Sequence, residues 1–312
     1  MKKTVSVVIC TNLLRKKKLK RCLLSVLNQE LRPDEVLVIS HGRPDEALTK
    51  FVENFNDWKQ IHTTATNLAD LRNIALKSSA SSVIAFIDDD AFAPKDWVKN
   101  ITAVFKEYSP AMSTGPILTS EPLNYWSKFS ELFSSPGLRI ESETYFVVGA
   151  NFAVNKHFFL KKKLHFSDIF KYGEDNQISI LVKQAKGLVR YAPNCFIFHD
   201  YRYAFKEFFV QQKNFKKYEY LLMRVYQYNY FGFMAYKRFP YLFPIIFLLR
   251  CRHTLSKVGS SWIFGVLVQE CSTVSGLVEG MFTWRKFYKT NSDKVKSLRV
   301  DARNQVSSHS AL

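Results

Sequence analysis

The chain has 312 residues, of which 47% are hydrophobic and 15% aromatic, so it can bury a sizeable core and is not disordered throughout. Lys and Arg number 45 against 27 Asp and Glu, which gives a net charge of +18 at pH 7. The excess concentrates from residue 201 onward, where 18 Lys and Arg stand against 6 Asp and Glu. This charge indicates a polyanionic partner, either an anionic membrane surface or a phosphorylated acceptor. Nucleic acid is not expected, because the basic region contains no recognised nucleic-acid-binding module.

The cysteines and the first residues bear on the compartment. The five cysteines are scattered and show neither a CxxC pair nor a Cys/His spacing of the zinc type. We therefore expect free thiols in a reducing compartment. The apolar run after Met1 is only of strand length, so we expect no signal peptide and a cytoplasmic protein.

The first hundred residues alternate apolar runs of strand length with segments of helical period. The predicted strands are Val5–Cys10, Val36–Ile39, Gln60–Thr64 and Ser82–Ile87, and the predicted helices are Leu19–Leu31, Ala47–Phe55, Leu68–Lys77 and Pro94–Tyr108. Strand, helix and strand in succession form right-handed βαβ units. The sequence therefore predicts an α/β fold with a doubly wound, mostly parallel sheet.

The pattern changes after Ala111. Predicted strands cover 112–118, 145–154, 188–191 and 197–200, a loop-rich stretch covers 121–138, and a helix follows Gly173. Gly149 interrupts the second of these strands, which indicates either a bulge or the close approach of a ligand or another backbone.

Three consecutive carboxylates, Asp88, Asp89 and Asp90, end the fourth predicted strand. The carboxyl ends of strands are where open α/β sheets bind ligands. A divalent cation such as Mg²⁺ or Mn²⁺ would neutralise such a cluster and would in turn bind a nucleotide diphosphate. The alternative is that these carboxylates cap the helix predicted from Pro94.

The last third is basic and aromatic. A basic, amphipathic helix is predicted from Phe205, a short apolar stretch covers 241–249, and a helix of spanning length, 262–282, contains Gln269 and two glutamates. Because polar residues make spanning costly, we expect this region, 201–290, to lie on a membrane or to pack on the preceding domain or a second copy. We expect residues 291–312 to form a polar, flexible tail.

An ordered set of motifs over residues 4–200 identifies a family. It comprises Val5–Thr11, Leu24–Gln29, Asn67 with Arg72-Asn73, Phe86–Asp90, Gly149–Asn151, Gly173–Asp175 and Phe198-His199. This set resembles the family-2 glycosyltransferases of the GT-A fold, which are inverting and contain a DxD motif. The resemblance implies a catalytic domain over 1–200, with a nucleotide-sugar half at about 1–110 and an acceptor half at about 111–200.

The resemblance also implies transfer of a sugar from a nucleotide-diphosphate donor to a hydroxyl of a glycan or lipid-linked glycan. The residues implied to bind the donor are Thr11, Ser40, Asn67, Arg72, Asp88 and Asp89. The implied metal ligands are Asp90 and Asp88, with His199 either a third ligand or a structural residue. The implied acceptor-binding residues are Gly149 and Asn151, and the implied general base is Asp175, with Glu174 orienting the acceptor or serving as a second base.

Ser40 departs from the family pattern, which has an Asp at the end of the second strand to contact the nucleobase. A hydroxyl lacks the carboxylate charge, so UDP is the expected nucleotide while GDP and dTDP stay open. Two other classes compete: a nucleotidyltransferase, and a GT-A-like subunit that binds without catalysing. The first would have a Gly-rich loop after its first strand, and Thr11–Leu14 contains no glycine; the basic run from Arg15 to Lys18 is expected to be solvated.

Overall fold

The computed structural model describes residues 4–119, 124–134, 141–200, 204–226 and 263–307. The chain divides into two compact units. The first unit contains residues 1–123 and 131–201, and the second contains 124–130 and 202–312.

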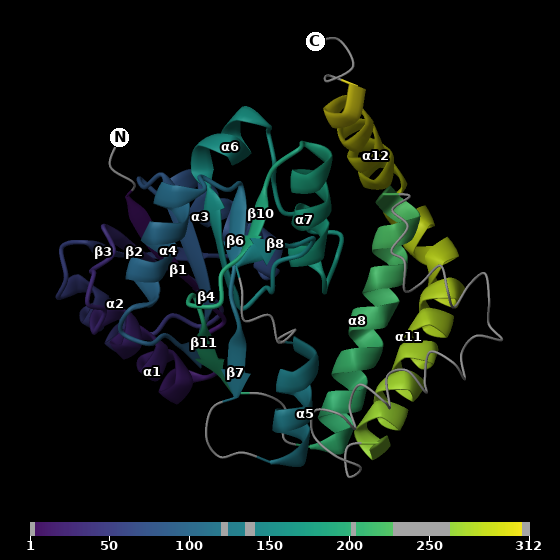
Figure 1. The fold of residues 1–312 in the computed structure, drawn as a ribbon, viewed down its shortest axis with the longest axis horizontal. Helices are drawn as coiled ribbons and strands as arrows, with labels where there is room; N and C mark the ends of the chain where they lie inside the picture. The colour runs from purple at the N-terminus through teal and green to yellow at the C-terminus, as the bar shows by residue number, and fades with distance from the viewer. Residues whose placement is uncertain (1–3, 120–123, 135–140, 201–203, 227–262, 308–312) are drawn as a thin grey trace. The chain divides into compact units, whose positions relative to one another are not determined.

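The first unit is built on an eight-stranded mixed sheet (Figure 1). Its strands are β1 (Val5–Thr11), β2 (Glu35–His41), β3 (Trp58–Thr63), β4 (Val83–Asp88), β6 (Met112–Thr114), β8 (Ser142–Glu143), β9 (Asn151–Asn155) and β10 (Val189–Tyr191). Their order is β3-β2-β1-β4-β9-β6-β10-β8, and β9 and β8 pair antiparallel with their neighbours. The predicted doubly wound, mostly parallel sheet is confirmed.

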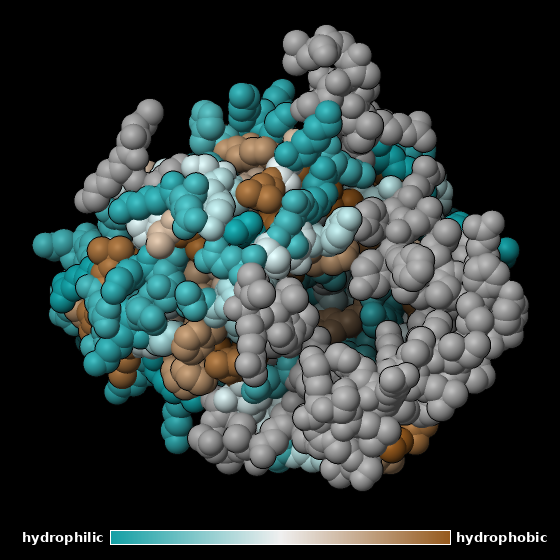
Figure 2. Space-filling view, in the orientation of Figure 1, coloured by the Kyte–Doolittle hydropathy of each residue, from teal (hydrophilic) through white to brown (hydrophobic). Residues whose placement is uncertain are grey.

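Side chains of alternate strand residues point to opposite faces of this sheet. Because both faces carry apolar side chains, helices cover both of them. The helices of this part are α1 (Lys16–Leu27), α2 (Glu46–Glu53), α3 (Leu68–Ser78) and α4 (Trp97–Glu107). One core cluster joins Val7, Val36 and Ala85 to apolar residues of α1, α2 and α4. On the other face α3 lies against β1 and β2. Over these helices the surface in Figure 2 is mostly hydrophilic, with small apolar patches.

The predicted strand over 112–118 is wrong as a single strand. It is split into β6 and β7 (Ile117–Thr119), and β7 belongs to a second, three-stranded sheet with β5 (Ala91–Phe92) and β11 (Ile197–His199). The turn between them passes close to another backbone, because a Cβ on Gly115 would lie 2.1 Å from the carbonyl oxygen of Cys195. The strand predicted over 145–154 begins only at Asn151.

Two helix predictions also change. The helix predicted from Pro94 begins at Trp97, so the three aspartates do not cap it. The stretch predicted as loop-rich contains α5 (Tyr125–Ser134), whose first part belongs to the second unit; residues 121–123 and 135–138 lie outside the described residues. The remaining helices of the first unit are α6 (Lys156–Lys161) and α7 (Glu174–Gln184).

The second unit contains α8 (Phe205–Tyr226), α11 (Ile263–Thr290) and α12 (Ser292–Ser307). Helices α8 and α11 lie side by side (Figure 1). Their close approach depends on glycine, since a Cβ on Gly276 would meet the carbonyl oxygen of Lys213 at 2.2 Å. Lys213 and Lys217 of α8 pair with Glu279 of α11 at 2.9 and 2.7 Å, so part of the predicted basic face is neutralised within the unit.

The expectation of a flexible tail over 291–312 is wrong for residues 292–307, which form α12. Val295 and Leu298 are buried one turn apart, and the Arg299 guanidinium donates to the carbonyl oxygens of Val225 and Arg224 at 3.0 and 2.8 Å. These contacts hold α12 on α8. The apolar stretch 241–249 lies outside the described residues.

Two expectations about the compartment can be compared with the described residues. Cys10, Cys22, Cys195 and Cys271 are free thiols, while Cys251 lies outside the described part of the chain. Within that described part, we find no helix with the length and apolar character needed to span a membrane.

Candidate active site

The first part of the site lies where β1 and β4 end side by side. Cys10 and Asp88 are partners in the register of these two strands. Because consecutive side chains alternate, Asp88 points to the α3 face and Asp89 points to the α1 face. There the Thr11 hydroxyl donates to Asp89 Oδ2 at 2.6 Å. Thr11, predicted to bind the donor, therefore holds Asp89, and its donor contact stays a prediction.

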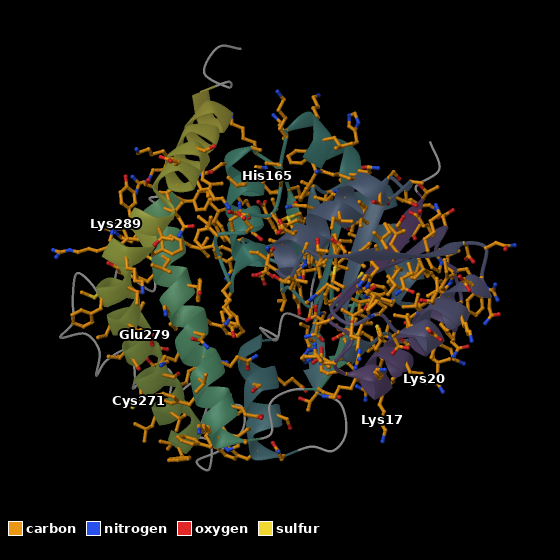
Figure 3. All side chains as sticks on the ribbon, turned by 180° about the vertical axis from the view of Figure 1, so that it is seen from behind. Lys17, Lys20, His165, Cys271, Glu279 and Lys289 are labelled. Carbon is orange, nitrogen blue, oxygen red and sulfur yellow. The ribbon has the colours of Figure 1, made fainter. Side chains whose placement is uncertain are left out.

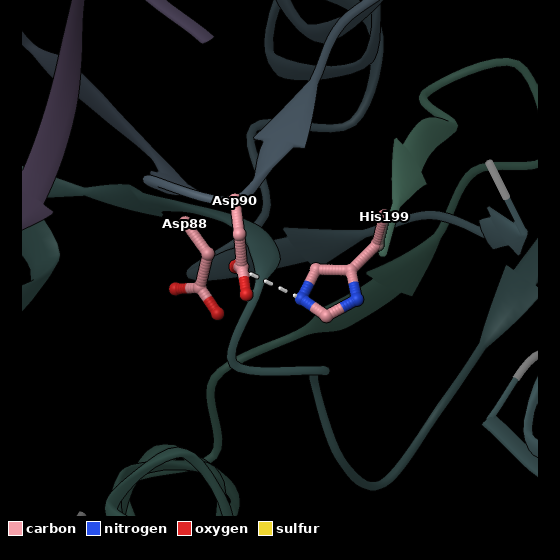
Figure 4. Close-up of side chains that lie close together, drawn as sticks. All are labelled: Asp88, Asp90 and His199. Atoms are coloured by element: carbon pink, nitrogen blue, oxygen red, sulfur yellow. Dashed lines mark ion pairs between the residues drawn. The ribbon is translucent and has the colours of Figure 1, made fainter. Parts of the chain in front are cut away.

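Asp88, Asp90 and His199 form a compact cluster (Figure 4). One potential ligand atom from each lies within 4.8 Å of the others. Asp90 follows β4, whereas His199 ends β11, and His199 Nε2 lies 3.1 Å from Asp90 Oδ1. Two carboxylates and an imidazole are a donor set that suits Mn²⁺ or Mg²⁺. The cluster therefore fits the predicted cation.

The charges of this cluster place its carboxylates in different states. Burial and then the charge of Asp90 raise the pKa of Asp88 to about 7, against the opposing influence of Arg72 and His199. Burial alone would also raise the pKa of Asp90, but the hydrogen bond and charge of His199, followed by the charge of Arg15, lower it to about 2. Asp90 is thus held ionised, while Asp88 needs further positive charge to ionise fully at neutral pH.

The basic run from Arg15 to Lys18 is not simply solvated, contrary to the prediction. The Arg15 guanidinium pairs with Asp89 at 2.5 Å and also with Asp90. Further along α1, Lys18 and Arg21 pair with Asp200 at 3.1 and 2.8 Å. The sequence analysis missed these residues, although their three-residue spacing on a helix that follows β1 was a signal that they share a face.

The second part of the site is the start of α7. Asp175 Oδ2 accepts a hydrogen bond from the Gly149 amide at 2.8 Å, and Asp175 Oδ1 accepts from the Asn176 amide at 2.8 Å. The neighbouring Glu174 accepts from the Arg72 guanidinium at 2.6 Å, and Arg72 also donates to the Gly149 carbonyl at 2.7 Å. One arginine therefore fixes both the glutamate and the segment that holds Asp175.

Arg72, implied by the resemblance to bind the donor, is 2% exposed. Its guanidinium lies 5.0 Å from the ring of Phe152 and 5.7 Å from that of Phe166. Aromatic faces and the Glu174 carboxylate together compensate the buried charge. The predicted contact of Arg72 with the donor stays a prediction.

Asp175 differs electrostatically from Asp90. Burial and then the charge of Glu174 raise its pKa to about 6, and Arg72 and the two backbone amides only partly oppose this. A carboxylate with this pKa exchanges its proton near neutral pH.

The Gly149–Asn151 segment joins the two parts. While Gly149 contacts Asp175, the Ala150 carbonyl accepts from the Asp88 amide at 3.3 Å. A Cβ on Gly149 would lie 3.0 Å from Asp175 Oδ2, so the glycine allows this side-chain carboxylate to approach, whereas the sequence indicates a bulge, a ligand or another backbone. The Asn151 side chain bonds to Trp97 Nε1 and to two backbone carbonyls, and its predicted acceptor role stays untested.

The two remaining predicted donor residues also have partners within the protein. Asn67 caps α3, where its Oδ1 accepts from the Asp70 amide at 2.8 Å. Ser40 is buried beside Thr11 in the β1–β2 register and bonds to His62 Nδ1 at 3.1 Å and to Gln60 Nε2 at 3.0 Å. The position where the family pattern has an aspartate is thus occupied by a hydroxyl that is already hydrogen-bonded within the protein.

Comparisons with known proteins agree with this arrangement. A family model described as "Glycosyl transferase family 2" matches residues 6–166, just over half of the chain. A curated relative, glucosyl-dolichyl phosphate glucuronosyltransferase of Haloferax volcanii, is 28% identical over 116 residues, which are 36% of this chain. The chain spans only 37% of the length of that relative.

Solved structures show the same fold at low sequence identity. S. aureus TarS 1–349 has a TM-score of 0.56 and 12% identity, over 97% of this chain and 89% of that one. GalNAc-T7, solved with UDP, GalNAc and Mn²⁺, has a TM-score of 0.54 and 16% identity, over 72% of this chain and 51% of that one. These similarities establish the GT-A architecture of the chain.

Proposed function

Since the chain belongs to glycosyl transferase family 2, we propose that it transfers a sugar from a nucleotide-diphosphate donor to an acceptor hydroxyl, with inversion at the anomeric carbon. The observation that carries the proposal is the Gly149–Asn151 segment, which contacts the backbone of Asp88 and the carboxylate of Asp175. A carboxylate cluster suited to the diphosphate and a carboxylate suited to proton transfer are thereby adjacent to one short stretch of chain. We assign this activity to a catalytic domain over residues 1–200.

Asp175 is the general base in this proposal. The acceptor oxygen attacks the anomeric carbon, its proton passes to the Asp175 carboxylate, and the bond between the sugar and the diphosphate breaks. The amides of Gly149 and Asn176 hold the two carboxylate oxygens in place. Glu174 is fixed by Arg72, so its part is to raise the pKa of Asp175 and to orient the acceptor.

Asp88, Asp90 and His199 would hold Mg²⁺ or Mn²⁺. Such a cation, when bound, neutralises the charge that grows on the departing diphosphate. Asp90 is the strongest candidate ligand, because His199 and Arg15 keep it ionised in the protein.

UDP is the proposed nucleotide of the donor. TarS 1–349 has been solved with UDP and with UDP-GlcNAc, and GalNAc-T7 with UDP. In this chain Ser40 would offer the base a hydroxyl in place of a carboxylate, so the preference over GDP or dTDP should be modest. Thr11, Asn67, Arg72 and Asp89 complete the proposed donor set.

A thermal-shift panel tests the proposal. UDP-, GDP- and dTDP-sugars are added with and without Mn²⁺, since a ligand that binds only the folded protein raises its melting temperature. We expect a UDP-sugar to stabilise the protein only when Mn²⁺ is present. Stabilisation that is independent of metal would refute the metal-assisted donor site, and the absence of any response would favour a subunit that binds no donor.

We further propose that the basic, helical region after residue 201 contacts an anionic membrane surface, where a glycan or lipid-linked acceptor would be met at the cytoplasmic side. Exposed apolar side chains line α11, among them Phe264, Met281 and Phe282. Lys289 projects from the last turn of the same helix (Figure 3). Phe282→Ser should reduce co-sedimentation with vesicles containing phosphatidylserine; unchanged binding together with dimer dissociation would assign this face to a second copy instead.

A further inference from the structure

Three cations share one face at the start of α1. Arg15 immediately precedes the helix, and Lys18 and Arg21 follow at intervals of three residues. Helical residues with this spacing are neighbours on the helix surface. Lys17 and Lys20 lie elsewhere on α1, are exposed, and are labelled on its outer side in Figure 3.

Arg15 contacts the first half of the proposed metal cluster. Its guanidinium bridges Asp89 Oδ1 at 2.5 Å and Asp90 Oδ2. The other oxygen of Asp90, Oδ1, faces His199 Nε2 at 3.1 Å. Because a guanidinium is a rigid fork, this contact fixes the rotation of the Asp90 carboxylate and leaves Oδ1 directed toward His199.

Lys18 and Arg21 contact the second half. Both pair with Asp200, whose side chain is 8% exposed and which directly follows His199. Arg21 also lies 4.5 Å over the ring of Phe92 on β5, the strand that pairs with β11, and 3.4 Å from the Asp90 carbonyl oxygen. The same helix face therefore holds two segments that are about a hundred residues apart in the sequence.

We propose that the basic face of α1, Arg15, Lys18 and Arg21, is a positioning element that preforms the divalent-cation site by fixing Asp90 and His199 relative to each other. This inference rests on the proposed function, in that the cluster is taken to bind Mn²⁺ or Mg²⁺. This role and the charge of the three residues predict opposite effects of their removal on metal affinity. Three cations near a metal site repel a divalent cation, so removing them should tighten metal binding if they act only through charge. Loss of their contacts with Asp90 and Asp200 should instead weaken metal binding.

The experiment is Mn²⁺ binding to the full chain, measured by electron paramagnetic resonance of the free ion. Arg15→Gln is compared with Lys17→Gln, and the double variant Lys18→Gln/Arg21→Gln with Lys17→Gln/Lys20→Gln, so that each pair removes the same charge. We expect Arg15→Gln and Lys18→Gln/Arg21→Gln to bind Mn²⁺ about 10- to 100-fold more weakly, as when residues that orient metal ligands are lost. The control variants should keep the wild-type affinity. Arg15→Lys should also bind weakly, because an ammonium cannot bridge two carboxylates in the same way.

Equal or tighter Mn²⁺ binding by Arg15→Gln overturns the proposal. Failure of the wild type to bind Mn²⁺ at all would refute the metal site itself, which is a different result. A second measurement does not depend on metal. With the chain metal-free, Arg15→Gln should melt at a lower temperature than Lys17→Gln, because buried Asp89 loses its cation. Equal melting temperatures would show that Arg15 does not hold Asp89 and Asp90 in place.

Discussion

Asp90 and Asp175 are carboxylates of one domain in opposite electrostatic surroundings. Asp90 is held by His199 and Arg15, and its pKa is about 2. Asp175 lies beside Glu174 with only backbone amides as its hydrogen-bond donors among the contacts described, and its pKa is about 6. A carboxylate that stays ionised can hold a cation, whereas one that titrates near 6 can accept a proton. The neighbouring residues, and not the residue type, therefore decide which of the two aspartates holds a cation and which accepts a proton.

Among the changes considered, replacing Asp175 should lower the transfer rate most. Asp175→Asn keeps the shape of the side chain but cannot accept the acceptor proton. We expect the transfer rate, measured as release of the nucleotide diphosphate in the presence of acceptor, to fall by about 10²- to 10⁴-fold. Glu53→Gln, an exposed carboxylate on α2, is the control and should transfer at the parent rate. Transfer by Asp175→Asn at the parent rate would remove the base assignment.

The pKa of Asp175 should also set the pH dependence of the reaction. Because the base must be ionised, kcat/KM of the wild type should fall on the acid side below about pH 6. Arg72 lowers the pKa of Asp175, so Arg72→Met should move this acid limb to higher pH. Arg72→Lys, which keeps the charge, should leave the limb nearer its original place.

The same variant has a cost in stability that must be measured beside the pH profile. Arg72→Met leaves Glu174 buried without its cation, a change that typically costs about 3–5 kcal/mol of unfolding free energy. Thermal melts should therefore show a lower midpoint. An acid limb that does not move in a variant that remains folded would contradict the electrostatic link between Arg72 and Asp175.

The smallest expected effect is that of Gly149→Ala. The new Cβ would lie 3.0 Å from Asp175 Oδ2, so the carboxylate must shift by a few tenths of an ångström. Such a misplacement should lower kcat by about tenfold or less. Donor affinity, measured by calorimetry, should be unchanged, since Asp90 and His199 are not displaced. A loss of donor affinity with normal kcat would instead place Gly149 in the donor site.

The strands and helices of the first hundred residues could be predicted because apolar residues recur at periods that single-sequence analysis detects. The carboxylates at the end of β4 could also be predicted as a site, because three charges cannot be buried without a partner. Contacts between distant segments could not be found. Burial of Arg72 by Glu174 and three phenylalanines depends on β9 and α7 packing over α3. Arg15 pairs with Asp89 and Asp90 only because β1 and β4 are neighbours in the sheet, which its sequence context does not indicate.

The second unit was harder to predict for a related reason. Helix α12 has a polar sequence, and Val295 and Leu298 alone do not form a strong periodic pattern. Its position is fixed instead by Arg299 bonding to the end of α8, which is a tertiary contact. A polar helix that depends on such a contact resembles a flexible tail in its sequence.

Calorimetric titration of UDP in the presence of Mn²⁺ tests the division of labour most directly, with the wild type, Asp90→Ala and Asp175→Asn compared side by side. We expect Asp175→Asn to bind UDP as the wild type does, while Asp90→Ala loses at least about tenfold in affinity and no longer depends on Mn²⁺ for binding. Equal losses in both variants, or undiminished Mn²⁺-dependent binding by Asp90→Ala, would contradict the assignment of separate tasks to the two carboxylates.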